Sequence, residues 1–171
     1  MTGRSVVLIG FSGSGKSAVA RVLAQRLGLD VFDTDAMIEA AAGRTVAQIF
    51  EDDGESAFRE RESVAVAEAA ARDGRVIACG GGAILAPQNY AALRDAGTIV
   101  YLRAAPSTIL ERLGDARDRP LLRGEAHTAV PALLAERSPA YVSAADVIVD
   151  TDGRTPEDVA GEIERILKER A

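Results

Sequence analysis

Short apolar runs and longer mixed stretches follow one another along the chain. The apolar runs are typical of strands that are buried on both faces of a sheet. We predict strands near residues 5–9, 30–33, 75–79, 98–102 and 146–150. We predict helices near residues 16–27, 35–42, 46–52, 56–72, 88–95, 106–113, 127–137 and 156–169. This alternation favours a parallel α/β sheet, and the length of 171 residues suits one domain, residues 1–171.

Local signals place several helix boundaries. Thr45 and Thr155 suit N-cap positions, and Pro156 suits the first position of the last helix. Gly43 and Gly97 are among the glycines that fall where a helix ends in a left-handed residue.

Two segments interrupt the alternation. A triple glycine, residues 80–82, ends the third predicted strand. Residues 114–126 are polar, contain three arginines and show little apolar periodicity. Long irregular segments in a compact domain are often lids or binding loops, so we predict a mobile lid over about residues 114–126.

The strongest chemical motif lies between the first predicted strand and helix. Residues 10–17 read GFSGSGKS and fit the phosphate-binding pattern G-x-x-x-x-G-K-[ST]. Its glycines let successive N–H groups converge on phosphate oxygens. Lys16 is expected to reach the β- and γ-phosphates, and the Ser17 hydroxyl is expected to ligate Mg²⁺. The alternative is a glycine-rich turn with a chance lysine, which the coincidence of six fixed features disfavours.

A pair of carboxylates closes the second predicted strand. Asp33 and Asp35, at i and i+2 in an extended segment, are expected to point the same way. They lie at the carboxyl edge of the sheet, where ligands bind. One could hold Mg²⁺ through water while the other takes a substrate proton. Alternatively, Asp35 or Thr34 only caps the next helix. No Asp follows the strand at residues 76–79, so Asp33 is the best substitute for the usual metal-binding Asp.

Three arginines and the triple glycine complete the candidate chemistry. Residues 80–82 offer bare backbone N–H groups to a small ligand, or simply form a tight loop. Arg59 lies at i, i+3 from Glu62, which could orient its guanidinium, although a solvated charged face is the default. Arg119 in the predicted lid could contact a phosphate, and Arg137 is either a ligand or a routine cation at a helix end.

Composition excludes several other classes. The net charge of −6 argues against a nucleic-acid partner, and no apolar run approaches a membrane span. We expect the chain to run directly into a strand, without a signal peptide. The single cysteine, Cys79, excludes an internal disulfide and fits a reducing compartment. With His127 as the only histidine, a zinc site and a Ser-His-Asp triad are both disfavoured. We therefore expect a cytoplasmic protein.

Taken in order, these segments resemble the shikimate kinase family, and the resemblance spans nearly the whole chain. The matching segments are residues 10–17, FDTD at 32–35, FRERE at 58–62, GGG at 80–82, RPLL at 119–122, RSPAY at 137–141 and DTDGRTP at 150–156. The resemblance implies a three-layer, nucleoside-monophosphate-kinase-like fold with a five-stranded parallel sheet, helices on both faces and a mobile lid. It also implies transfer of the ATP γ-phosphate to the 3-hydroxyl of shikimate, in aromatic amino-acid biosynthesis.

The resemblance assigns roles to individual residues. The expected catalytic residues are Asp35 as base, Lys16 and Arg119. The residues expected to bind ATP are Gly13, Ser14, Gly15, Lys16, Ser17, Ala18, Arg112, Arg119, Arg154 and Pro156. The residues expected to bind shikimate are Asp35, Arg59, Gly80, Gly81, Gly82, Arg137, Phe50 and Phe58. Mg²⁺ would be held by Ser17 and, through water, by Asp33.

One departure and two rivals accompany this assignment. Ala18 stands where many members carry a hydroxyl residue, which weakens one nucleotide contact and leaves the Mg²⁺ ligand intact. The first rival is another small P-loop kinase that acts on gluconate or a nucleoside monophosphate. The second is a nucleotide-binding regulatory module without catalysis. A monomer that binds shikimate and ATP, and neither nucleic acid nor membrane, is the expectation.

Overall fold

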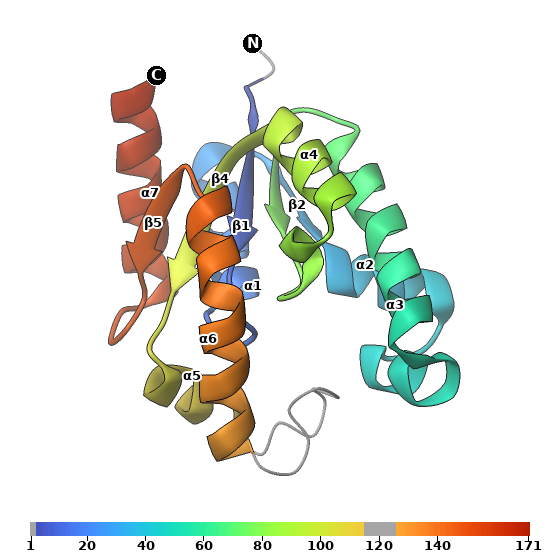
Figure 1. Ribbon diagram of the computed structural model, residues 1–171. Helices are drawn as coiled ribbons and strands as arrows, with labels where there is room; N and C mark the ends of the chain where they lie inside the picture. The colour runs from blue at the N-terminus through green and yellow to red at the C-terminus, as the bar shows by residue number, and fades with distance from the viewer. Residues whose placement is uncertain (1–2, 115–125) are drawn as a thin grey trace.

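A five-stranded parallel sheet forms the centre of the computed structural model, which describes residues 3–114 and 126–171 (Figure 1). The strands are β1 (Ser5–Ile9), β2 (Asp30–Asp33), β3 (Arg75–Ala78), β4 (Gly97–Arg103) and β5 (Val147–Asp150). Their order across the sheet is β2-β3-β1-β4-β5, and every adjacent pair is parallel. The α/β class, the parallel sheet and all five predicted strands are confirmed.

Helices connect the strands. They are α1 (Lys16–Leu27), α2 (Thr34–Ala42), α3 (Val46–Ala70), α4 (Pro87–Ala96), α5 (Pro106–Leu113), α6 (Ala126–Ala144) and α7 (Pro156–Arg170), with a 3-10 turn η1 (Ala83–Leu85) before α4. Within the two described ranges, none of them is long and apolar enough to cross a membrane. The predicted lid, apart from its end residues Gly114 and Ala126, lies outside the described residues.

The two faces of the sheet carry two separate apolar cores. On one face Val6 and Leu8 of β1 pack with α1 and α7, drawn in blue and red in Figure 1. On the other face Val7 and Ile9 pack with α3, α4, α5 and α6. Because successive strand residues point to opposite faces, both faces must be apolar, which explains the unbroken hydrophobic run that predicted β1.

Helix α3 contains a break that the sequence predicted. The helix spans Val46 to Ala70, but the backbone of Gly54 within it is not helical, with φ 88° and ψ 170°. The Thr45 hydroxyl caps the first part and accepts a hydrogen bond from the N–H of Gln48 at 3.1 Å. The two predicted helices, 46–52 and 56–72, are therefore confirmed as two helical parts on either side of one glycine.

The predicted end of α6 at residue 137 is wrong. The helix continues through Pro139 to Ala144 and places Arg137 within its length, so Arg137 is not a cation at a helix end. Proline usually ends a helix because it lacks an N–H. Here the buried ring of Tyr141 packs against Tyr101 of β4, with ring centroids 5.0 Å apart, and this contact lies beyond the proline. Burial of the following turn thus outweighs the local signal.

Gly97 does not have the left-handed conformation that we predicted for it. Its φ of −176° is extended, and it begins β4 directly opposite Ser5 of β1. A Cβ at this position would lie 1.8 Å from the carbonyl oxygen of Ser5. Close approach of two strands, rather than a helix end, requires glycine here.

We therefore expect Gly97→Ala to lower the free energy of unfolding by about 2 kcal/mol or more, because the backbone of β1 must shift. Gly161→Ala is the matched control. Gly161 lies inside α7, and its added Cβ would meet only Arg26 Nη2 at 3.8 Å. This control should raise stability by about 0.5–1 kcal/mol. Urea unfolding measures both, and equal effects would contradict the close-approach explanation.

Candidate active site

The candidate site lies at the carboxyl edge of the sheet, around the central strand β1. From β1 the chain crosses to β2 on one side, and from β3 it crosses back to β4 on the other side. Such a reversal of direction leaves a crevice above the carboxyl ends of the strands, where ligands bind in open α/β sheets. The GFSGSGKS loop follows β1 and opens into this crevice.

The loop has the strand–loop–helix context that the motif requires. Gly10, Gly13 and Gly15 have φ angles of 146°, 83° and 94°, which residues other than glycine rarely adopt. Lys16 begins α1, and its Nζ donates to the carbonyl oxygens of Gly10 at 2.6 Å and Phe11 at 2.9 Å. The loop thus combines a helix N-terminus, bare N–H groups and an ammonium group, which suits a polyphosphate.

Asp33 links the loop to β2. The Ser17 hydroxyl donates to Asp33 Oδ2 at 2.6 Å, while Oδ1 of the same carboxylate accepts from the N–H of Ala36 at 3.1 Å. Asp33 is therefore the residue that caps α2, rather than Thr34 or Asp35. The hydroxyl of the buried Thr34 instead accepts from the N–H of Gly80 at 3.0 Å and ties the start of α2 to the triple glycine.

We expected Asp35 to lie in an extended segment, and this is wrong, because α2 already begins at Thr34. It lies in the first turn of α2 and, with Ser17 and Asp33, lines a cavity of about 350 Å³. Its Oδ1 would be 2.7 Å from a Cβ on Gly80, and Glu62 Oε2 would be 2.9 Å from the same point. The two carboxylates therefore face the backbone of Gly80 together.

The triple glycine is both a tight turn and a source of N–H donors. The carbonyl of Gly80 accepts from the N–H of Ala83 at 3.1 Å, and that of Gly82 accepts from Leu85 at 3.2 Å. The N–H groups of Gly81 and Gly82 have no hydrogen-bond partner among the described residues. The turn thus keeps its acceptors occupied and leaves donors available to an anion.

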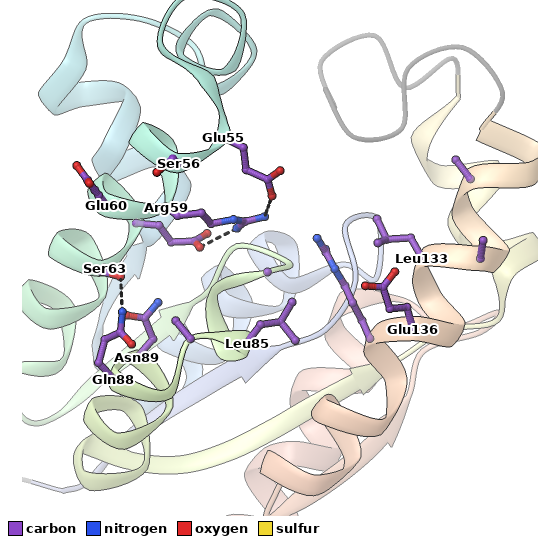
Figure 2. A pocket seen from close by; sticks show the side chains of 16 residues that line it. Glu55, Ser56, Arg59, Glu60, Ser63, Leu85, Gln88, Asn89, Leu133 and Glu136 are labelled. Carbon is purple, nitrogen blue, oxygen red and sulfur yellow. Dashed lines mark hydrogen bonds and ion pairs between the residues drawn. The ribbon is translucent and has the colours of Figure 1, made fainter.

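Arg59 of α3 and Arg137 of α6 reach the triple glycine from opposite sides. A Cβ on Gly82 would lie 2.6 Å from Arg59 Nη1, and one on Gly81 would lie 3.3 Å from Arg137 Nη1. Both arginines line a cavity of about 970 Å³ between α3 and α6, and Figure 2 shows Arg59 reaching into it. Two guanidinium groups beside free N–H donors can bind a carboxylate.

Glu55 and Glu62 hold the Arg59 guanidinium at its two ends. Arg59 Nη1 donates to Glu62 Oε1 at 2.8 Å, and Nη2 lies 3.4 Å from Glu55 Oε1 (Figure 2). Phe58 lies beneath the same guanidinium, 5.3 Å from ring centroid to carbon, and packs against Phe50 with centroids 4.7 Å apart. The two phenylalanines therefore support Arg59.

Glu62 is an enclosed part of the site, which its sequence spacing did not predict. It is only 2% exposed, and burial raises the pKa of its carboxyl above the usual range despite the nearby Arg59. Asp35 raises this pKa further and Arg137 lowers it. The i, i+3 spacing predicted the contact with Arg59, but it could not predict burial beside Asp35.

Arg112 and Arg154 lie on the other side of the P-loop. Arg112 Nη1 donates to Thr151 Oγ1 at 3.1 Å and to the Gly13 carbonyl at 3.3 Å, which joins the P-loop to the segment after β5. Arg154 donates to the Asp150 carbonyl at 2.9 Å, and Pro156 begins α7 as predicted. Arg112 therefore lies beside Gly13, while Arg154 and Pro156 lie in the segment that follows β5.

Most of the predicted site residues thus meet at one edge of the sheet. Ser14 is buried within the P-loop, and Ala18 lies in the first turn of α1. Arg119 lies outside the described residues.

A P-loop beside an anion site and a carboxylate is an arrangement typical of phosphoryl-transfer enzymes. The family model described as shikimate kinase matches residues 12–168. A shikimate kinase of Symbiobacterium thermophilum is 48% identical over 169 residues, covering 97% of each chain. One of Geobacter sulfurreducens is 46% identical, covering 98% of this chain and 92% of the relative. The chain belongs to the shikimate kinase family.

A solved structure agrees with the fold. The shikimate kinase from Acinetobacter baumannii in complex with shikimate matches with a TM-score of 0.96 at 35% identity. The match covers 99% of this chain and 95% of that one. The P-loop kinase fold that we expected is therefore confirmed.

The enclosed carboxyl of Glu62 predicts a pH effect on stability. Because its pKa is raised in the folded protein, the folded state keeps the proton longer than the unfolded state does. The stabilisation that this proton gives is complete below pH 4.5 and is lost as the pH rises through the higher folded pKa. The unfolding free energy of the wild type minus that of Glu62→Gln should therefore fall as the pH rises above 4.5.

Denaturant unfolding at a series of pH values measures this difference. Glu60→Gln is the matched control, since Glu60 is an exposed carboxylate on the same helix. A wild-type-minus-Glu62→Gln difference that rises with pH would show that the ion pair with Arg59 outweighs burial.

Proposed function

We propose that this chain transfers the γ-phosphoryl group of ATP to the 3-hydroxyl of shikimate, giving shikimate 3-phosphate and ADP. The observation that carries the proposal is the pair of guanidinium groups over a triple glycine with free N–H donors, next to a P-loop. Family membership supports the same activity. The step belongs to aromatic amino-acid biosynthesis.

The substrate carboxylate would bind between Arg59 and Arg137. A guanidinium binds a carboxylate through two parallel N–H groups, which fixes orientation as well as charge. The N–H groups of Gly81 and Gly82, which have no partner among the described residues, add neutral donors beside them. A cavity of about 970 Å³ leaves ample room for a small polyhydroxylated acid.

Asp35 would act as the general base. It lies beside Gly80 and lines a cavity together with Ser17. The 3-hydroxyl proton would pass to the Asp35 carboxylate as the 3-oxygen attacks the γ-phosphorus and the bond to the β–γ bridging oxygen breaks. Lys16 would stabilise charge on the β- and γ-phosphates, and we retain the predicted phosphate contact of Arg119 as a proposal.

The donors present also fit Mg²⁺. This ion prefers oxygen ligands, keeps several waters and usually takes only one or two protein groups beside the phosphates. The Ser17 hydroxyl and the Asp33 carboxylate, 2.6 Å apart, are such a pair. When bound, Mg²⁺ neutralises developing charge on the β- and γ-phosphate oxygens. Arg112, Arg154 and Pro156 would flank the adenine, and we retain a monomer in the cytoplasm as a prediction.

A coupled assay of ADP formation tests the function against its rivals. Purified protein is given Mg-ATP and, side by side, shikimate, gluconate, AMP or CMP. We expect ADP formation that depends on shikimate. Turnover of gluconate or a nucleotide instead would indicate a different P-loop kinase, and no turnover of any acceptor would favour the non-catalytic module.

The two carboxylates should respond differently to Mg²⁺. Asp35→Asn keeps the shape and loses the base, so turnover should fall by roughly 100-fold or more at every Mg²⁺ concentration. Asp33→Asn should chiefly raise the Mg²⁺ concentration needed for half-maximal rate. Mg²⁺ titrations of kcat separate the two variants. Rescue of Asp35→Asn by excess Mg²⁺, without rescue of Asp33→Asn, would reverse these assignments.

Replacing Arg59 or Arg137 by Lys keeps the charge but loses the two-pronged contact. Breaking such a desolvated charge pair costs about 2–5 kcal/mol, which should appear as a higher KM for shikimate with little change for ATP. The loss should be largely absent for an analogue with a carboxamide in place of the carboxylate. Equal losses for acid and amide would show that these arginines act elsewhere.

A further inference from the structure

The hydroxyl of Tyr141 connects two groups of the anion site from behind. Tyr141 is fully buried on α6, one turn after Arg137. Its Oη donates to the carbonyl oxygen of Gly81 at 2.5 Å. Arg137, one turn earlier, lies close enough to this hydroxyl for its charge to oppose the rise in the Tyr141 pKa. One hydroxyl therefore contacts the triple glycine and lies near an arginine.

The contact with the Gly81 carbonyl fixes a peptide plane. In a trans peptide the C=O of one residue and the N–H of the next point in opposite directions, and no cis peptide bond occurs among the described residues. Because the Gly81 carbonyl points at Tyr141, the N–H of Gly82 must point away from it. That N–H has no partner among the described residues, and Gly82 lines the large cavity.

A glycine turn needs such an anchor more than other turns do. Glycine reaches many backbone conformations at little cost, so the plane between Gly81 and Gly82 could rotate. Rotation would turn a carbonyl oxygen, instead of an N–H, toward a bound anion. The carbonyls of Gly80 and Gly82 are already held by Ala83 and Leu85, which leaves that of Gly81 to the Tyr141 hydroxyl.

We propose that Tyr141 is a positioning residue that fixes the Gly82 N–H and the Arg137 guanidinium for the substrate carboxylate. The proposal rests on the function proposed above, since it assumes an acidic acceptor. The tilted ring of Tyr101, with its centroid 5.0 Å away, packs against the Tyr141 ring and keeps it in place, so the hydroxyl has a defined position. Burial raises the pKa of Tyr141 to about 12, so the hydroxyl remains a donor over the whole working pH range.

Tyr141→Phe tests the proposal because it removes one oxygen and keeps the buried ring. We expect KM for shikimate to rise on the order of tenfold, since the buried Gly81 carbonyl loses its donor. KM for ATP should not change, and kcat should stay within about twofold. With the carboxamide analogue, the KM values of wild type and variant should differ much less, because the neutral amide forms no ion pair with Arg137.

Tyr101→Phe is the matched control. It removes a hydroxyl from the other ring of the same pair, and the described structure gives that hydroxyl no bond to residues 80–82. We expect its KM for shikimate to equal that of the wild type. Thermal unfolding of both variants shows how much each hydroxyl contributes to the fold.

The possible outcomes separate the two proposals. If the wild type does not turn over shikimate, the proposed function fails. If the wild type is active and Tyr141→Phe has an unchanged KM for shikimate, only the positioning role fails. Equal losses for acid and carboxamide, or a loss that appears equally for ATP, would show that Tyr141 acts only through the stability of the fold.

Discussion

Close approach at the triple glycine is the constraint on which the rest of this site depends. Side chains from three helices crowd the positions where these glycines would carry a Cβ. A Cβ on Gly80 would lie 2.7 Å from Asp35 and 2.9 Å from Glu62, one on Gly82 would lie 2.6 Å from Arg59, and one on Gly81 would lie 3.3 Å from Arg137. Any other residue type would push these groups apart. Four charged groups can therefore surround one short turn, and its backbone supplies the donors between them.

Such a cluster is tolerated because its charges balance. Arg59 and Arg137 offset Asp35 and Glu62, and the Glu62 carboxyl is held by Arg59 at 2.8 Å. Burial nevertheless raises the pKa of Glu62, which means that enclosing the charged form of this carboxyl costs free energy. A substrate carboxylate would bring a further negative charge to the arginines, and the neutral N–H donors of the turn help to accommodate it.

Much of the fold and of the site could be predicted because the signals are local. The Val-rich run of β1, the P-loop pattern and the N-caps Thr45 and Thr155 each depend on a few neighbouring residues. The break in α3 was predictable for the same reason, since Gly54 lies between two helical stretches. Local signals failed at α6, where the packing of Tyr141 extends a helix beyond its proline.

The sequence by itself determined the succession of strands and helices along the chain, the P-loop and the set of charged residues. Each of these depends only on which residues follow one another in the chain. Only the tertiary structure decided which partners they meet. Gly97 must be glycine because Ser5 lies opposite it, and Glu62 is enclosed because β2 and β3 bring Asp35 beside it. These pairs are far apart in sequence, so no local pattern records them, and their distances and burial arise only when the sheet is assembled.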